Sequence, residues 1–177
     1  GAFEAIYFNN VDLSTITGDS MTFNRDNGVY LYNGSDTNTI SANITDFDYV
    51  GVYVSASSNG NTFSDNLARS NVLYGVGLDA SSNNTLKNNT AGSNASHGMY
   101  ISAGSKNNSL SDNIVLSNTG HGIYFYSSSN NNVARRNLVN SNSSGVKIHL
   151  SHSNVVELNL ISANVKGVEI VDSSTGN

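Results

Sequence analysis

The 177-residue chain has no cysteine, no proline and no tryptophan, and only 12% of its residues are charged. Without cysteine it holds neither a disulfide framework nor a thiolate metal site. Eight scattered Lys and Arg against thirteen Asp and Glu give a net charge of −5, which argues against nucleic acid as a partner. No apolar run approaches the roughly 18 residues of a membrane span, so we predict no such span.

Asparagine, serine and glycine are abundant instead, with 30, 29 and 16 copies. These residues are poor in helix interiors because they compete for backbone hydrogen bonds or cost backbone entropy, so a long helical bundle is excluded. Two classes remain, namely a disordered low-complexity chain and a repeat protein. A fixed sequence period distinguishes a repeat protein from a disordered chain, because a disordered chain does not require one.

One four-residue phrase recurs eight times at spacings of 22 to 24 residues, which chance does not produce. Its copies are AIYF at Ala5, GVYL at Gly28, GVYV at Gly51, GVGL at Gly75, GMYI at Gly98, GIYF at Gly122, GVKI at Gly145 and GVEI at Gly167. The chain is therefore a repeat protein.

Asparagine recurs at three further positions of each repeat, about five residues apart. The columns are Asn38, Asn61, Asn84, Asn108, Asn132, Asn154 and Asn177; then Asp19, Asn43, Asn66, Asn89, Asn113, Asn137 and Asn159; then Asn24, Asp48, Asn71, Asn94, Asn118, Asn142 and Asn164. Short alternating stretches lie between the columns, and Ser, Asn and Gly runs join them at turns.

Three short strands per repeat cannot bury an apolar face within one repeat. They can do so if the chain coils and equivalent strands of successive repeats pair in parallel, with Val29 and Leu31 pointing inward. Stacked Asn side chains then hydrogen-bond between coils about 4.8 Å apart. We predict an all-β, right-handed, single-stranded parallel β-helix of about seven coils of 22–24 residues, with three short strands per coil. It forms one domain over residues 1–177, uncapped at both ends.

The repeat resembles that of right-handed parallel β-helix proteins through the phrase G-[IV]-Y-[LI], followed by S-S-x-N-N-x-[IL] and later Asn positions, as in residues 122–142. It is most similar to NosD-like and CASH-type (carbohydrate-binding and sugar-hydrolase) surface and periplasmic proteins of archaea and bacteria. The resemblance covers almost the whole chain and implies the fold. It leaves function open, because the same fold serves lyases, hydrolases, adhesins and scaffolds.

Cleavage of a polysaccharide requires carboxylates in register, and the sequence offers none. Gly120-His121-Gly122 is similar to the Gly-His-Gly element of polygalacturonases, but no pair of Asp residues lies on the preceding coils. Arg135 and Arg136 lack the acidic calcium cluster that a pectate-lyase-like mechanism needs. We therefore predict that the chain is not an enzyme.

His97 and His121 occupy the same position in adjacent coils and are the strongest metal-ligand candidates. Imidazole suits copper, and the resemblance to NosD-like proteins implies copper binding. Two histidines without a neighbouring carboxylate are a thin ligand set, so a stacked histidine ladder is favoured. Asp46 and Asp48 share a corner, where a calcium ion is the alternative to solvated turn carboxylates.

The third position of the phrase forms a column that faces solvent by strand alternation. Five of its eight members are Tyr, and Gly77 interrupts it beside Asp79, which predicts a shallow notch. The column either only stabilises the coils by stacking, or it forms a strip that binds sugar rings or another protein. The predicted binding strip consists of Tyr7, Tyr30, Tyr32, Tyr53, Tyr100, Tyr124, Tyr126 and Asp79.

Unpaired strands at the two ends of an uncapped β-helix invite further pairing. The chain is then either a fragment of a longer β-helix or a subunit that stacks head to tail into a filament. The edges expected to carry this assembly contain Ala5, Ile6, Phe8, Val168 and Ile170.

Seven N-x-[S/T] sequons occur, and Asn33, Asn83 and Asn107 fall in exposed turns where a glycan fits. We predict an extracellular or cell-surface scaffold that assembles head to tail, with the tyrosine strip as a lateral or adhesive contact. The alternative is a carbohydrate-binding or polysaccharide-cleaving β-helix that uses the same face. A third is a periplasmic, NosD-like metal-binding protein. No cofactor is expected beyond a calcium ion or a glycan.

Overall fold

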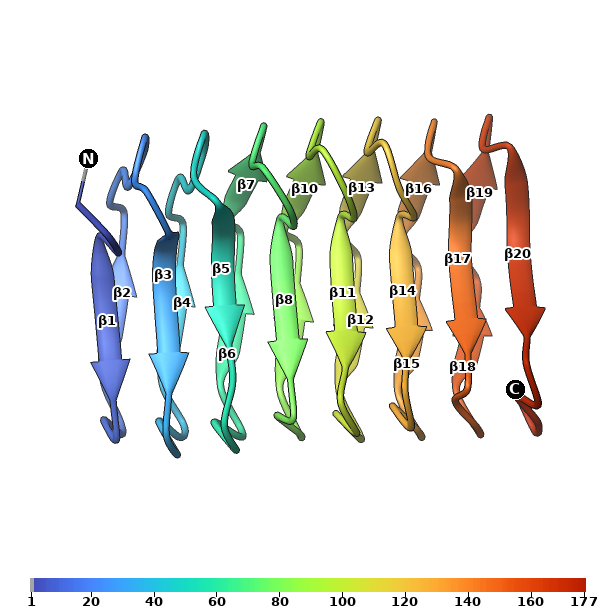
Figure 1. Ribbon diagram of the computed structural model, residues 1–177, viewed down its shortest axis with the longest axis horizontal. Coiled ribbons are helices and arrows are strands. Elements are labelled where there is room, and N and C mark those ends of the chain that lie inside the picture. The colour runs from blue at the N-terminus through green and yellow to red at the C-terminus, as the bar shows by residue number, and fades with distance from the viewer. Residues whose placement is uncertain (1) are drawn as a thin grey trace.

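A computed structural model describes residues 2–177 as parallel strands wound into a solenoid, with the two ends of the chain at opposite ends of the stack (Figure 1). Gly1, with which the predicted domain begins, lies outside the described residues. Residues 2–177 contain no helix, and therefore none that could span a membrane. The predicted all-β class is confirmed.

The strands form three parallel sheets that run along the stack. The eight-stranded sheet contains β1 (Ile6–Asn9), β3 (Asn27–Tyr32), β5 (Val50–Val54), β8 (Val76–Asp79), β11 (Met99–Ser102), β14 (Ile123–Tyr126), β17 (Ser144–His149) and β20 (Lys166–Val171). The seven-stranded sheet contains β2 (Thr15–Thr17), β4 (Thr39–Ser41), β6 (Thr62–Ser64), β9 (Thr85–Lys87), β12 (Ser109–Ser111), β15 (Val133–Arg135) and β18 (Val155–Glu157). The five-stranded sheet contains β7 (Leu67–Arg69), β10 (Thr90–Gly92), β13 (Ile114–Leu116), β16 (Leu138–Asn140) and β19 (Leu160–Ser162).

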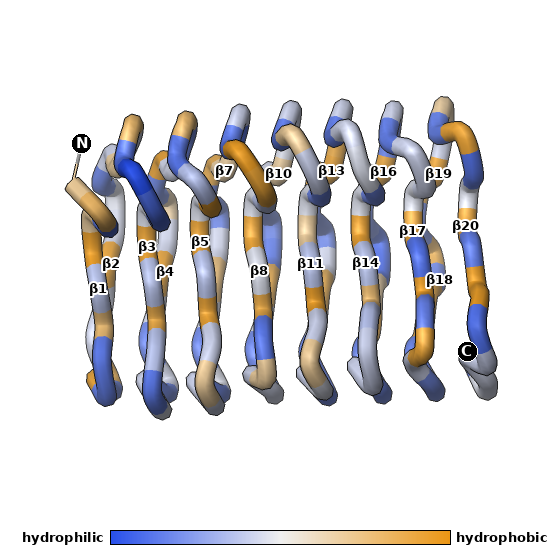
Figure 2. The backbone as a smooth tube through the Cα atoms, in the orientation of Figure 1, coloured by the Kyte–Doolittle hydropathy of each residue, from blue (hydrophilic) through white to orange (hydrophobic). Residues whose placement is uncertain are grey.

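The core is a column of apolar side chains that repeats at the same level of every coil, as the hydropathy colouring makes visible (Figure 2). In the eight-stranded sheet Val29 and Leu31 point inward and are fully buried, as alternation predicts. In the three-residue strands only the middle residue points inward, as Ile40 and Phe63 do. Each coil therefore contributes a few apolar residues to a core that only the stack completes.

The three asparagine columns are hydrogen-bonded ladders at the corners of the coils. Asn113 is typical, because its Oδ1 accepts the backbone N–H of Asn89 at 2.9 Å and its Nδ2 donates to the Leu86 carbonyl at 3.0 Å and to Asn137 Oδ1 at 2.9 Å. The ladders are buried, so these bonds satisfy backbone groups that water does not reach. The prediction that asparagine is structural is confirmed.

The third strand of the coil differs in the first two coils, where only the single bridges Ser20–Ile44 and Ile44–Leu67 form. Thr45 there occupies the inward position that Ala68 fills one coil later, and its Oγ1 donates a hydrogen bond to the Leu67 carbonyl. A polar residue on the inner side of this corner accompanies the loss of regular pairing. Three strands per coil are complete from β7 onward.

Candidate functional site

The outward side of the eight-stranded sheet carries the tyrosine column, and we call it the tyrosine face. Tyr7 pairs with Tyr30, and Tyr30 with Tyr53, across β1, β3 and β5. Their ring centroids lie 5.4 and 5.3 Å apart, close to the strand spacing. Tyr100 and Tyr124 continue the column on β11 and β14 at 5.5 Å. Stacking between coils stabilises this face, whatever it binds.

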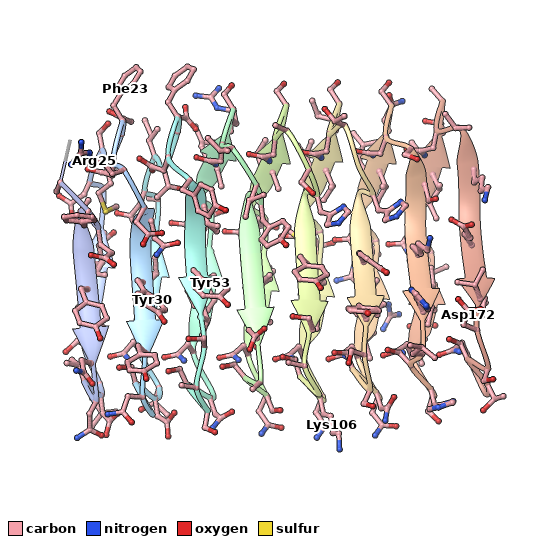
Figure 3. All side chains as sticks on the ribbon, in the orientation of Figure 1. Phe23, Arg25, Tyr30, Tyr53, Lys106 and Asp172 are labelled. Carbon is pink, nitrogen blue, oxygen red and sulfur yellow. The ribbon has the colours of Figure 1, made fainter. Side chains whose placement is uncertain are left out.

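All nine tyrosines of the chain lie on or beside this face. Tyr32 and Tyr126 lie two residues further along β3 and β14, and Tyr49 and Tyr74 lie in the corners before β5 and β8. Tyr30 and Tyr53 project side by side toward the viewer in Figure 3. No such gathering occurs for phenylalanine, because Phe63 and Phe125 are buried in the core and Phe23 and Phe47 form an exposed stack at a corner.

The phenols of Tyr53, Tyr100 and Tyr124 keep their protons over the physiological range. Burial is the largest cause that raises the pKa of Tyr53, Tyr100 and Tyr124 to about 12. Tyr30 Oη lies 3.0 Å from Ser55 Oγ, which fixes the direction of that phenol. The face therefore presents neutral aromatic rings with hydroxyls that can donate and accept hydrogen bonds.

The notch expected at Gly77 is occupied by neighbouring rings. A Cβ at Gly77 would lie 3.0 Å from Tyr53 Cδ2 and 3.4 Å from Tyr74 Cδ2, so both rings lie over this residue. The missing side chain thus gives room to two tyrosines instead of leaving a hollow. Asp79 ends the same strand, β8, and its Oδ2 accepts a hydrogen bond from Ser102 Oγ at 3.2 Å.

A pocket of about 300 Å³ opens next to these rings, at the start of β3, β5 and β8. Its lining residues are Asp26, Asn27, Tyr30, Tyr49, Val50, Tyr53, Leu73 and Tyr74. Tyr30 and Tyr53 belong to the predicted binding strip, whereas Asp26, Tyr49 and Tyr74 were not predicted. Each of the missed residues lies one or two positions before a glycine phrase, and that offset was the signal that could have revealed them.

His97 and His121 stack as the sequence suggests, with ring centroids 5.1 Å apart and planes at 5°. Tyr74 extends this stack, with its ring 5.6 Å from that of His97. His97 Nδ1 accepts the backbone N–H of His121 at 3.0 Å, and burial lowers the pKa of His97 to about 4. Burial also lowers the pKa of His121. Both rings are therefore neutral ladder members, and no group of three or more metal-ligating side chains exists among the described residues.

One hydrogen-bonded chain on the tyrosine face can move a proton. Tyr124 Oη lies 2.9 Å from His149 Nδ1, and His149 Nε2 lies 2.9 Å from the Asp172 carboxylate. In this order a carboxylate orients an imidazole, and the imidazole accepts the proton of a hydroxyl group. The relay lies at the C-terminal end of the tyrosine face, with the pocket at the other end.

The lysines of this face are confined to β17 and β20, where one carboxylate offsets part of their charge. Lys147 Nζ lies 3.6 Å from the Glu169 carboxylate, and Lys166 also contacts Glu169. Hydrogen bonds from Lys166, and then from Ser144, lower the pKa of Glu169 to about 2. Two lysines and one glutamate leave a positive charge in excess at this end of the face.

The acidic corner suggested for calcium is otherwise engaged. Asp46 forms an ion pair with Arg69 at 2.8 Å, and Asp48 belongs to the third asparagine column, where it accepts hydrogen bonds from Asn24. The two carboxylates thus serve the coil contacts of this corner.

The three candidate glycosylation sites lie on one set of turns. Asn33, Asn83 and Asn107 are exposed and adopt positive φ angles of 57° or 58°, which asparagine tolerates. Their side chains are accessible for a glycan, and glycosylation stays a prediction.

The predicted assembly edges are the two ends of the eight-stranded sheet. Ile6 and Phe8 lie on β1, Ala5 precedes it, and Val168 and Ile170 lie on β20. Val168 and Ile170 are about half exposed, at 48% and 49%. Each end strand has one partner among the described strands, and head-to-tail association stays a prediction.

Fold and surface together define a class: a parallel β-solenoid with asparagine ladders and one aromatic outer face. The chain belongs to the right-handed β-helix family, whose "Right handed beta helix region" matches residues 4–161 and 102–177. This confirms the resemblance drawn from the repeat. No curated protein has significant sequence similarity to the chain.

Several solved structures share this fold. The periplasmic alginate epimerase AlgG superposes with a TM-score of 0.89 at 23% identity, over 97% of this chain and 46% of AlgG. The A-module of the mannuronan C-5 epimerase AlgE4 of Azotobacter vinelandii gives 0.72 at 11% identity, over 97% and 53%. The Streptococcus pneumoniae surface protein and adhesin PfbA gives 0.52 at 10% identity, over 94% and 64%. The chain thus spans about half the length of the epimerases. At these sequence identities the superpositions show a shared fold alone.

These comparisons correct the prediction that the chain is not an enzyme. The solved structures that match it with TM-scores of 0.89 and 0.72 are those of enzymes, the epimerases AlgG and AlgE4. The prediction was based on missing carboxylate sets, which bear on glycosidases and calcium-dependent lyases alone. The comparisons also give no support to a filament-forming scaffold.

Proposed function

We propose that the chain is the β-helix part of a polysaccharide-modifying protein, and that the polysaccharide lies along the tyrosine face, across the coils. The observation that carries this proposal is the gathering of all nine tyrosines on or beside one face of the solenoid. Stabilisation of the coils by stacking does not account for Tyr49, which lies outside the column, stacks on no ring within the described residues and lines the pocket together with Tyr74.

The chemistry of the face suits sugars. Aromatic rings contact the apolar C–H faces of a sugar ring, and neutral phenols exchange hydrogen bonds with its hydroxyl groups. The column repeats this chemistry at every coil from β1 to β5 and again on β11 and β14. A regular polymer is the ligand that a regular row of contacts fits, because each coil can hold an equivalent part of it.

The Tyr124–His149–Asp172 relay is the group to which we assign chemistry on the bound polymer. Tyr124 Oη takes a proton from the bound polymer as His149 accepts the phenol proton, so one proton moves from the ligand to the imidazole, and Asp172 stabilises the resulting imidazolium. Lys147, with Nζ 5.8 Å from the centre of the Tyr124 ring, supplies a positive charge beside it. The periplasmic location of AlgG supports a location outside the cytoplasm for this chain as well.

Affinity electrophoresis in gels that contain acidic or neutral polysaccharides tests the proposal. We expect at least one polysaccharide to retard the wild-type chain, and Tyr53→Ala and Tyr100→Ala to abolish most of this retardation. Phe23→Ala is the matched control, because Phe23 is 66% exposed and stacks only on Phe47 at a corner, away from the tyrosine face (Figure 3). Equal retardation of all variants, or none for any polysaccharide, would overturn the proposal.

A further inference from the structure

We propose that the pocket beside β3, β5 and β8 holds one uncharged sugar residue, and that the ligand of the tyrosine face is therefore a neutral polysaccharide and not a uronan. This inference rests on the proposed function and adds the class of polymer. The pocket volume of about 300 Å³ is at the lower end for ligand sites, which suits a single sugar residue of a longer chain.

Positive charge is missing where a uronate carboxylate would need it. The segments of β1, β3, β5, β8, β11 and β14 contain no Lys or Arg. The two lysines of the sheet, Lys147 and Lys166, lie on β17 and β20 and contact Glu169. Arg25 precedes the pocket residue Asp26, but its guanidinium lies over the Phe3 ring at 5.9 Å. A polyanion on this half of the face would have no cation to pair with.

Negative charge is present at the same place. Asp26 lines the pocket, and Asp79 lies at the far end of β8, outside the pocket lining. Burial is the largest cause of the raised pKa of Tyr30 and of Tyr53. The charge of Asp26 also raises the pKa of Tyr30, and the charge of Asp79 that of Tyr53, because each carboxylate lies near the ring. They would repel a uronate residue, whereas they can accept hydrogen bonds from the hydroxyls of an uncharged sugar.

The rings of the pocket are arranged so that a sugar can contact them. Gly77 breaks the column after Tyr53, so within the described residues the Tyr53 ring stacks on only one other ring, that of Tyr30. A ring that is stacked on both sides offers a ligand only its edge. The side of the Tyr53 ring toward β8 lies over Gly77 beside Tyr74, so a sugar in the pocket contacts those parts of the Tyr53 and Tyr74 rings that line it, next to Asp26.

Isothermal titration calorimetry with two matched probes tests this inference. β-1,4-linked mannohexaose and β-1,4-linked hexamannuronate share their ring stereochemistry and differ only in the CH₂OH or carboxylate group on C5. We expect mannohexaose to bind on the order of tenfold more tightly than hexamannuronate, and Tyr53→Ala to weaken mannohexaose by a similar factor. Asp26→Asn should narrow the ratio of the two affinities, because it removes a like charge from the pocket. Phe23→Ala should leave both affinities unchanged.

Each outcome separates this inference from the function on which it rests. Tighter binding of hexamannuronate, lost in Tyr53→Ala, would overturn the neutral-sugar pocket and leave polysaccharide binding by the tyrosine face intact. Mannohexaose binding that neither Tyr53→Ala nor Asp26→Asn changes would overturn the pocket assignment. Absence of binding by either probe and by every polysaccharide of the gel panel would overturn the proposed function, and this inference with it. Thermal melts followed by circular dichroism verify that each variant is folded.

Discussion

Asp48 is a residue at which we expect the stability of the solenoid to depend strongly on pH. Its side chain is buried within the third asparagine column. Oδ1 accepts hydrogen bonds from the backbone N–H of Asn24 at 2.7 Å and from Asn24 Nδ2 at 3.0 Å, whereas Oδ2 has no partner within the described part of the chain. Burial raises the pKa of this carboxyl from 3.8 to about 6, against the two hydrogen bonds, which lower it.

The sign and size of the effect follow from this pKa. The folded chain binds the Asp48 proton more tightly than the unfolded chain, so the stabilisation is fully present below about pH 4 and is lost as the pH rises through about 6. A shift of about two units corresponds to about 3 kcal/mol, at 1.36 kcal/mol per unit. We therefore expect the Asp48 carboxylate to lower the free energy of unfolding by about 3 kcal/mol at about pH 8.

Asp48→Asn removes the charge and completes the asparagine column, because the new Nδ2 can donate to Asn71 Oδ1, as Asn71 donates to Asn94. Urea unfolding followed by circular dichroism should find the variant more stable by about 3 kcal/mol at about pH 8, with the difference shrinking toward about pH 4. His97 has the opposite effect on the pH dependence of stability, since its pKa is lowered. The wild type and the variant both contain His97, so its contribution cancels in their difference. Asp19→Asn, at an exposed end of the second column, is the control. A stability difference that is the same at every pH would refute this reasoning.

Three further predictions concern the ladders and the tyrosine face. Asn113→Ala should lower the free energy of unfolding by about 3 kcal/mol, because it leaves the buried backbone N–H of Asn89 without an acceptor; a urea midpoint equal to that of Lys106→Ala, at an exposed turn, would contradict it. Gly122→Ala should cost about 2 kcal/mol, since its Cβ would lie 2.5 Å from Val139 Cγ1, whereas Gly167→Ala has nothing within 4 Å and should be nearly neutral in the same assay. In an NMR titration the imidazole of His97 should stay neutral down to about pH 4, and protonation near its ordinary pKa of 6.5 would show that its ring is not buried in the ladder.

The repeat made the fold predictable to the level of single residues. A period of 22 to 24 residues fixes which strands pair, and alternation within each strand fixes which side chains point inward. For this reason Val29 and Leu31 were placed in the core correctly and the three asparagine columns were identified as ladders. Both inferences depend on position within a strand or corner, and the period determines these positions.

The pocket was not predictable in the same way. Asp26, Tyr49 and Tyr74 precede their strands and lie in corners, where side-chain direction depends on the local turn and not on alternation. The prediction of a notch at Gly77 was wrong for a related reason. The rings of Tyr53 and Tyr74 lean over Gly77, and the direction of their side chains does not follow from the sequence pattern. The prediction that the chain is not an enzyme was wrong because missing carboxylates exclude particular reactions, not catalysis in general.

Hydroxyl-radical footprinting read by mass spectrometry, with and without the polysaccharide that retards the chain most in affinity gels, is the most direct test of where the ligand lies. We expect oxidation of Tyr30, Tyr53 and Tyr100 to fall when the polysaccharide is bound, while oxidation of Phe23 and Phe47 stays the same. Protection at the exposed corners or along the seven-stranded sheet, with the tyrosines unchanged, would contradict the assignment of the tyrosine face as the polysaccharide-binding surface.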